Sequence, residues 1–195
     1  MNKPEPPPAR FSQTDGLMKT NLALIGFMGT GKTAVGRLLA GRLGLSFIEM
    51  DAIIEMKAGK TIPAIFERGG ETEFRELEIA AAAEAARKSR AVIACGGGIV
   101  LNRINIDHLH DTSIIVCLTA SPAVILKRVS RQVGQRPLLE VDDPARTIRD
   151  LLKFRKPLYE QAADITVNTS RLSMEAVVDT IVKQLEEDES LDWSK

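Results

Sequence analysis

The chain has 195 residues, the length of one domain with room for a sizeable hydrophobic core. Its 26 basic and 26 acidic side chains balance, so no overall charge favours nucleic acid or a membrane surface. No apolar run approaches the roughly 20 residues of a membrane span, and the first residues lack the apolar core of a signal peptide. We therefore expect a soluble, cytoplasmic protein without nucleic-acid or membrane partners.

Residues 1–19 carry prolines among polar residues and show no hydrophobic periodicity. This composition favours a disordered extension, and a proline segment that binds a partner is the alternative. The folded domain is expected to span residues 20–187, followed by an acidic tail at 188–195.

A phosphate-binding motif follows the first predicted strand, residues 20–26. Residues 26–33 read Gly-Phe-Met-Gly-Thr-Gly-Lys-Thr and fit the pattern G-x-x-x-x-G-K-S/T at every fixed position. A helical pattern continues from there to Leu43. In this context the backbone N–H groups face one anion, Lys32 adds a mobile charge, and Thr33 offers a hydroxyl to Mg²⁺. The motif predicts binding of a nucleoside triphosphate.

The second predicted strand, residues 46–50, ends among acidic side chains. Glu49 and Asp51 lie at its carboxyl end. Ligands of parallel sheets bind outside the carboxyl ends of the strands, so both carboxylates are expected beside the phosphate loop. Asp51 as the N-cap of a helix over 52–57 is the alternative.

Two helices are predicted next, one beginning with Thr61 as N-cap and one running from Glu71 to Ser89, with a break at Gly69-Gly70. Glu71, Arg75 and Glu78 share one face of the longer helix. Taken alone, Arg75 is more typical of a surface ion pair than of a ligand contact.

The apolar run at 91–95 predicts a strand buried on both faces, and Gly96–Gly98 follow it directly. Three glycines at a strand end indicate a backbone that something approaches closely, and a flexible turn is the alternative. Cys95 and Cys117 each end an apolar run and are interpreted as buried thiols rather than as a disulfide or metal pair. His108 and His110 are interpreted as surface residues.

A strand at 113–118 and a helix from Ser121-Pro122 to about Arg131 precede an irregular, arginine-bearing stretch. That stretch predicts a mobile lid over about 128–142, with a solvated loop as the alternative. A helix capped by Asp143, a strand at 164–167 and a helix at 173–185 complete the chain. Strands and helices alternate, so we expect an α/β fold with a mainly parallel sheet covered by helices on both faces.

With these elements in order, the chain resembles the shikimate kinase family from about Asn21 to Leu185. The phosphate loop alone is not specific to that family. Further stretches match its motifs in order: Glu49-Met50-Asp51 for an Asp-x-Asp pair; Ile62 to Phe66, Gly70-Glu71 and Phe74 to Glu78 for I-x-x-I-F … G-E-x-x-F-R-x-x-E; Gly96–Gly98 for a glycine triplet; Arg136 to Leu139 for the lid; and Arg155 with Leu158-Tyr159 for R-x-x-L-Y.

The resemblance implies a monomeric enzyme that transfers the γ-phosphoryl group of ATP to the 3-hydroxyl of shikimate, in aromatic amino acid synthesis. It implies the fold of nucleoside monophosphate kinases, a P-loop kinase with five parallel strands in the order 2-3-1-4-5 and a mobile lid. Asp51, Lys32 and Arg136 would be catalytic, and Asp51 would hold the substrate hydroxyls.

Other roles carry over from the same motifs. Arg75 and Arg155 would grip the substrate carboxylate, while Gly97 and Gly98 would line its ring. Arg128 would pack on adenine, with Arg131 as the alternative, and an adenine contact is also expected within 168–171, where Arg171 is our choice. The remaining contacts to ATP and Mg²⁺ would come from Gly29, Thr30, Gly31, Lys32, Thr33, Ala34, Arg136 and, for the metal, Thr33 and Glu49.

One departure from the family pattern concerns the metal. Glu49 replaces the first aspartate of the pair, and its longer side chain could weaken or relocate a contact to Mg²⁺. Two other functions stay open at this point. One is a gluconate-type kinase of the same fold, which the Arg75 and Arg155 pair argues against. The other is a nucleotide-binding regulatory protein that has lost catalysis.

Overall fold

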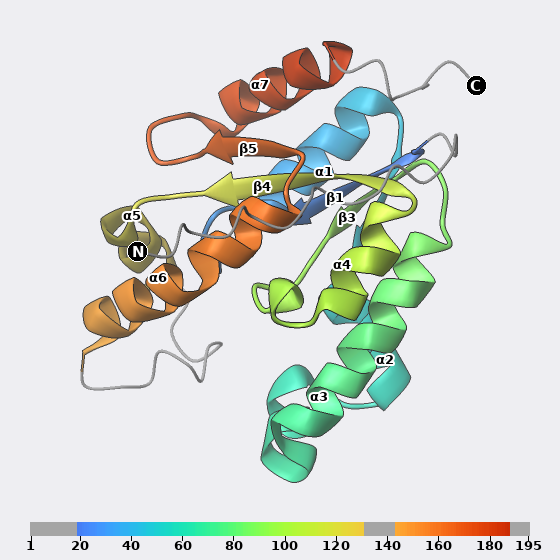
Figure 1. The fold of residues 1–195 in the computed structure, drawn as a ribbon, viewed down its shortest axis with the longest axis vertical. Coiled ribbons are helices and arrows are strands. Elements are labelled where there is room, and N and C mark those ends of the chain that lie inside the picture. Colours follow the sequence, from blue (N-terminus) through green and yellow to red (C-terminus); the bar gives the residue numbers. More distant parts are fainter. Residues whose placement is uncertain (1–18, 131–142, 188–195) are drawn as a thin grey trace, which may run out of the picture.

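A computed structural model describes residues 19–130 and 143–187 and shows one parallel β-sheet with helices on both faces (Figure 1). The five strands lie in the order β2-β3-β1-β4-β5, and all the pairs are parallel. This confirms the predicted order. The strands are β1 Asn21–Ile25, β2 Ser46–Glu49, β3 Ala91–Ala94, β4 Ser113–Thr119 and β5 Ile165–Asn168.

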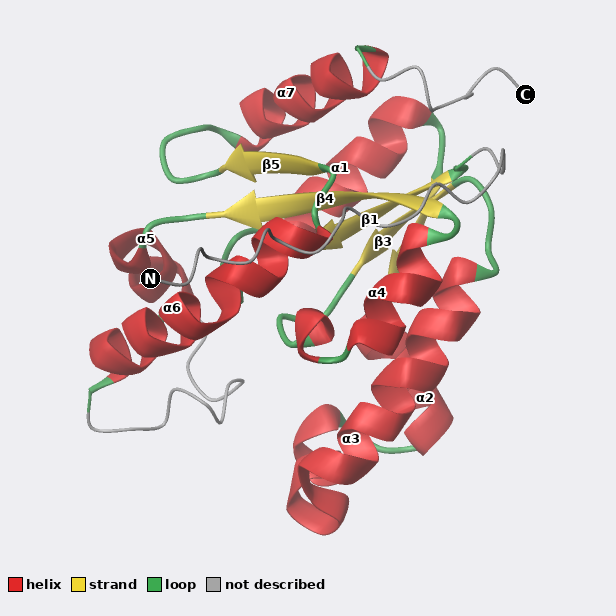
Figure 2. Cartoon of the chain, in the orientation of Figure 1, coloured by secondary structure: helices red, strands yellow, loops and turns green. Residues whose placement is uncertain are grey.

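Alternate residues of the inner strands contribute to two separate hydrophobic cores, because successive side chains of a strand point to opposite faces of the sheet. Leu22 and Leu24 of β1 pack beneath α1 and α7, whereas Ala23 and Ile25 pack beneath α2 to α6. Figure 2 shows these two layers of helices with the sheet between them. The helices are α1 Lys32–Leu43, α2 Met50–Ala58, α3 Ile62–Ala86, α4 Arg103–His110, α5 Pro122–Val129, α6 Pro144–Ala162 and α7 Met174–Glu186, with a 3₁₀ turn η1 at Ile99–Leu101.

The helix ends follow the capping residues in the sequence. The side chains of Ser121, Asp143 and Ser173 accept hydrogen bonds from the backbone N–H three residues on, at 3.4, 2.9 and 3.2 Å. Gly44 ends α1 in the left-handed conformation. The predicted break at Gly69-Gly70 is a kink within α3, where Gly70 has φ 69° and ψ −166°.

The structure excludes the alternative role of Asp51 as an N-cap, because α2 begins at Met50 and places Asp51 in its first turn. His108 and His110 are partly exposed, and His110 Nε2 lies 3.8 Å from a carboxylate oxygen of Asp164. Cys95 and Cys117 are buried and free, as predicted.

Within the described residues, no helix combines the length and apolarity needed to cross a membrane. The predicted extension, apart from Lys19, lies outside the described residues. So do residues 131–142 of the predicted lid and the tail at 188–195.

Candidate active site

The phosphate loop joins β1 to α1 and curls because glycines occupy positions that other residues rarely adopt. Gly29 and Gly31 have φ values of 74° and 101°, in the left-handed region. At Gly26 an added Cβ would lie 2.2 Å from the carbonyl oxygen of Leu118, so only glycine fits beside β4. Lys32, the first residue of α1, donates from Nζ to the carbonyl oxygens of Gly26 and Phe27 at 2.8 and 3.0 Å. The Lys32 ammonium group therefore bridges from the start of α1 back to the first two residues of the phosphate loop.

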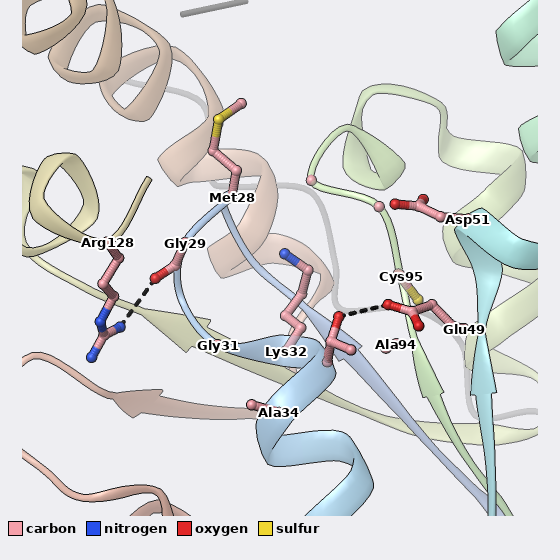
Figure 3. A pocket seen from close by; sticks show the side chains of 13 residues that line it. Met28, Gly29, Gly31, Lys32, Ala34, Glu49, Asp51, Ala94, Cys95 and Arg128 are labelled. Carbon is pink, nitrogen blue, oxygen red and sulfur yellow. Dashed lines mark hydrogen bonds between the residues drawn. The ribbon is translucent and has the colours of Figure 1, made fainter. Parts of the chain in front are cut away.

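A cavity of about 410 Å³ opens between this loop and the carboxyl ends of β2 and β3 (Figure 3). Its position is the one expected for a ligand site in a parallel sheet. The lining residues come from the phosphate loop and α1, from the acidic end of β2, from the end of β3 and from α5: Met28, Gly29, Gly31, Lys32, Thr33, Ala34, Glu49, Asp51, Ala94, Cys95, Gly96, Gly97 and Arg128. The structure thus brings Gly29, Gly31, Lys32, Thr33, Ala34 and Arg128 of the predicted nucleotide-binding residues into one cavity with Asp51, whereas Thr30 and Arg171 do not line it.

Glu49 reaches the phosphate loop directly. Its Oε1 accepts a hydrogen bond from the Thr33 hydroxyl at 2.8 Å, and its Oε2 forms an ion pair with Arg37 at 3.1 Å. Arg37 in turn lies over the ring of Phe47, with its guanidinium carbon 4.6 Å from the ring centroid. The hydroxyl and the carboxylate are hard oxygen donors, the kind that Mg²⁺ prefers, so these two residues fit the predicted metal contact.

Arg128 joins the phosphate loop to the segment after β5. Its guanidinium donates to the carbonyl oxygen of Gly29 at 3.1 Å, and to the hydroxyl and carbonyl oxygens of Thr169 at 2.9 and 2.8 Å. Arg171 is exposed on the same segment, whereas Arg131 and Arg136 lie outside the described residues. Thr169 is a further residue of this site that no sequence motif marks. Its buried hydroxyl accepts a hydrogen bond from Arg128 and donates one to the carbonyl oxygen of Thr30.

Arg75 lies between two carboxylates and the glycine triplet. Its Nη1 donates to Glu78 at 2.7 Å and its Nη2 to Glu71 at 2.9 Å. A Cβ on Gly98 would lie 2.6 Å from Nη1, so the guanidinium rests directly against that backbone. Glu78 is only 1% exposed, and burial raises the pKa of its carboxyl group, opposed by Arg75.

Arg155 and Tyr159 of α6 meet the same triplet one residue earlier. Arg155 Nη1 and the Tyr159 hydroxyl both donate to the carbonyl oxygen of Gly97, at 3.2 and 2.6 Å. Arg155 is 7% exposed and lies over the ring of Phe27, 5.7 Å from its centroid. Burial raises the pKa of the Tyr159 hydroxyl, so it stays a neutral donor.

Gly96 completes this arrangement on the acidic side. A Cβ at Gly96 would lie 3.4 Å from both Asp51 Oδ1 and Glu78 Oε1, and one at Gly97 would lie 3.2 Å from the backbone nitrogen of Met28. The triplet therefore touches two carboxylates, the phosphate loop and two arginines within three residues. Close neighbours at each of the three positions favour the predicted close approach to this backbone over a turn without contacts.

A phosphate loop with its lysine borders a cavity that Asp51 and the first two residues of the glycine triplet also line, and two arginines contact that triplet. Together with the 2-3-1-4-5 sheet, this arrangement defines a P-loop kinase of the nucleoside monophosphate kinase type. A family model for shikimate kinase matches residues 28–186. The shikimate kinase of Thermodesulfovibrio yellowstonii is 45% identical over 166 residues, which cover 85% of this chain and 95% of that protein. The chain therefore belongs to the shikimate kinase family, whose enzymes use ATP to phosphorylate shikimate.

Two further shikimate kinases are similar to this chain, one in structure and one in sequence. The shikimate kinase from Acinetobacter baumannii in complex with shikimate has a TM-score of 0.83 and 38% identity, over 88% of this chain and 95% of that one. The shikimate kinase of Caldanaerobacter subterraneus is 45% identical over 163 residues, or 84% of this chain and 94% of that protein. A gluconokinase from Sinorhizobium meliloti, with 16% identity and a TM-score of 0.54, shares the fold alone.

Proposed function

We propose that this kinase transfers the γ-phosphoryl group of ATP to the 3-hydroxyl of shikimate, with Asp51 directing the hydroxyl and Arg75 and Arg155 binding the carboxylate. The observation that carries the proposal is the glycine triplet, against which Asp51, Arg75 and Arg155 converge beside the phosphate loop. Shikimate carries one carboxylate, which suits the two arginines, and three hydroxyls, which suit the Asp51 carboxylate.

The ATP phosphates would bind in the phosphate loop. Backbone N–H groups from Gly29 to Ala34 and the positive end of α1 favour an anion at this place. Lys32 holds its ammonium group on two loop carbonyl oxygens, from which it can turn to the β- and γ-phosphates. Arg128 would stack on adenine. Its hydrogen bonds to Gly29 and Thr169 lie in the plane of the guanidinium, so they are compatible with a ring on its face.

The substrate carboxylate would lie between the two arginines. A guanidinium binds a carboxylate with two parallel hydrogen bonds, and here the two groups come from different helices, α3 and α6. The backbones of Gly97 and Gly98 would line the ring, because neither residue carries a side chain of its own. A gluconate-type substrate is open-chain, and this pairing of two arginines beside a glycine backbone without side chains favours a cyclic acid.

Thr33 and Glu49 would hold Mg²⁺ together with the nucleotide, Thr33 directly and Glu49 from its place on the Thr33 hydroxyl. When bound, Mg²⁺ supplies positive charge to the phosphate oxygens and helps to align them. The extra methylene of Glu49, compared with the family aspartate, is taken up by its reach to Thr33 and Arg37. We therefore expect activity to survive this departure.

In the transfer step, the substrate oxygen forms a bond to the γ-phosphorus while the bond to ADP breaks. The proton of the attacking hydroxyl passes to Asp51, which lies in the cavity facing Gly96. Phosphoryl transfer depends mainly on positioning and charge neutralisation, and Lys32 would supply positive charge from this chain. Arg136, outside the described residues, would add charge from the lid.

The test is ADP release by the purified full chain with ATP and Mg²⁺, with shikimate and gluconate as parallel substrates. We expect release that depends on shikimate and none with gluconate. Turnover of gluconate alone would refute the substrate assignment. ATP binding without turnover of either acid would support the regulatory alternative. We also propose a monomeric, cytoplasmic enzyme, as the resemblance to the family implies, and light scattering would detect a dimer.

A further inference from the structure

Asn105 is a fully buried amide on α4, remote from the phosphate loop in the sequence and absent from the predicted site. It is 0% exposed. Its Nδ2 donates to Glu78 Oε2 at 3.4 Å and to the carbonyl oxygen of Ile99 at 3.5 Å. The opposite amide orientation would place Oδ1 against the carboxylate, so electrostatics favours Nδ2 on this side. Asn105 thus connects α4 both to α3 and to the turn that follows the glycine triplet.

Both groups that Asn105 contacts are next to Arg75: one is the Glu78 carboxylate, and the other belongs to the backbone that follows Gly98. Glu78 Oε2 also accepts from Arg75 Nη1 at 2.7 Å, so Asn105 supports the carboxylate that holds the arginine. Ile99 follows Gly98, and it is Gly98 whose backbone Arg75 rests against. The Asn105 amide therefore contacts both the carboxylate that binds Arg75 and the backbone segment against which Arg75 packs.

Glu78 has few other donors. Its Oε1 has no hydrogen-bond partner among the described residues, although the atom is buried. Burying a carboxylate with few hydrogen-bond donors costs free energy, so the loss of one donor should disturb Glu78 strongly. Asn105 is well suited to the place because an amide donates a hydrogen bond without adding a charge beside Arg75.

We propose that Asn105 is a positioning residue for substrate binding, which holds the Glu78 carboxylate so that Arg75 stays against Gly98 and meets the substrate carboxylate. The inference rests on the proposed role of Arg75. Asn105 does not contact the substrate in this proposal. It acts on Arg75 and on the glycine backbone through its contacts with Glu78 and Ile99.

The main test is Asn105→Leu, which keeps a similar volume and removes the donor. We expect the KM for shikimate to rise about tenfold, the size of effect typical of one lost hydrogen bond to a charged group. The KM for ATP and kcat should stay within about twofold, because the phosphate loop is not touched. An unchanged KM for shikimate would overturn the inference.

A matched control is available on the same helix. Asn102 is the N-cap of α4, and its side chain accepts from the backbone N–H of Ile104 at 3.0 Å. Asn102→Ala should lower Tm and leave both KM values unchanged. If Asn105→Leu lowered Tm and changed both KM values in parallel, or behaved as Asn102→Ala does, its role would be structural and the inference would fail.

The isosteric variant Asn105→Asp gives a second readout that a structural role does not predict. The charged groups that face Glu78 are Arg75 on its own helix, Asp51 on α2 and Arg155 on α6. An aspartate at 105 would add a like charge at neutral pH, whereas a protonated aspartic acid would again donate to Glu78. We expect the KM for shikimate in this variant to fall toward the wild-type value as the pH is lowered. A KM ratio that does not change with pH would contradict the proposal.

Arg75→Ala, measured in the same series, separates the two proposals. If Arg75→Ala leaves the KM for shikimate unchanged, the proposed carboxylate site is wrong. If Arg75→Ala raises it and Asn105→Leu does not, only the role of Asn105 is wrong.

Discussion

Replacing Gly98 with alanine tests the carboxylate site with a single methyl group. The new Cβ would lie 2.6 Å from Arg75 Nη1 and 2.9 Å from Nη2, where ordinary contact begins at 3.4 Å. The guanidinium would have to move by about 0.8 Å while Glu78 and Glu71 hold it at 2.7 and 2.9 Å. Gly98 itself has φ −100° and ψ 0°, a conformation open to alanine, so the effect is steric and not a matter of backbone strain.

The expected result of Gly98→Ala is a rise in the KM for shikimate of roughly 10- to 100-fold. A charge-assisted hydrogen bond contributes about 1.5–3 kcal/mol, and each 1.4 kcal/mol is tenfold in affinity. Steady-state kinetics should show an unchanged KM for ATP. Gly41→Ala, on α1 with nothing within 4 Å of the new Cβ, is the control and should leave the kinetics unchanged while stabilising the fold by about 0.5–1 kcal/mol. A wild-type KM in Gly98→Ala would refute the placement of the substrate carboxylate at Arg75.

Four other outcomes follow from the site. Asp51→Asn should lower kcat by at least about 10²-fold in the coupled assay and leave ATP affinity, measured by calorimetry, near normal; full turnover would remove Asp51 from the mechanism. Lys32→Met should abolish turnover and weaken ATP binding in the same two assays. Arg155→Ala should raise the KM for shikimate more than Arg75→Ala does, and equal or reversed effects would contradict the charge argument below. Burial raises the pKa of Glu78 above 4.5, so the native state binds this proton more readily than the unfolded state. Its contribution to stability is present below about pH 4.5 and is lost as the pH rises through the folded-state pKa. The Tm of Glu78→Gln relative to wild type should therefore increase from about pH 4 to about pH 7, and a constant difference would show that this carboxyl does not titrate as inferred.

Local patterns were enough to predict the sheet and most of the helices. Strands such as β3 are continuous apolar runs, and caps such as Ser121, Asp143 and Ser173 act within three residues. The order of the strands came instead from resemblance to a family, because hydrophobic periodicity does not state which strands are neighbours. Asp51 shows the limit at a helix end, because α2 begins at Met50, two residues earlier than an N-cap at Asp51 would place it.

The parts of the site that the sequence did not reveal depend on contacts between distant segments. Thr169 binds Arg128 and Thr30, which lie 41 and 139 residues away. Asn105 reaches Glu78 across 27 residues. Neither residue type is unusual at its position, so no local signal marks it. Arg75 is a different case. The sequence favoured a surface ion-pair partner, and Arg75 does form ion pairs, but one of its two partners is the buried carboxylate of Glu78, which lies against Gly96 at the cavity.

The two arginines differ in how much positive charge they offer to a substrate. Arg75 is held by Glu71 and Glu78, so its charge is largely offset and its main contribution is direction. No carboxylate lies within ion-pair distance of Arg155 among the described residues, where the Gly97 carbonyl oxygen and the Phe27 ring face its guanidinium. Its buried Nε also has no partner within that part of the chain. A buried cation with no carboxylate in direct contact is costly, and an arriving carboxylate would relieve that cost. Substrate affinity should therefore depend more on Arg155, while Arg75, Glu78 and Asn105 determine the orientation of the bound acid.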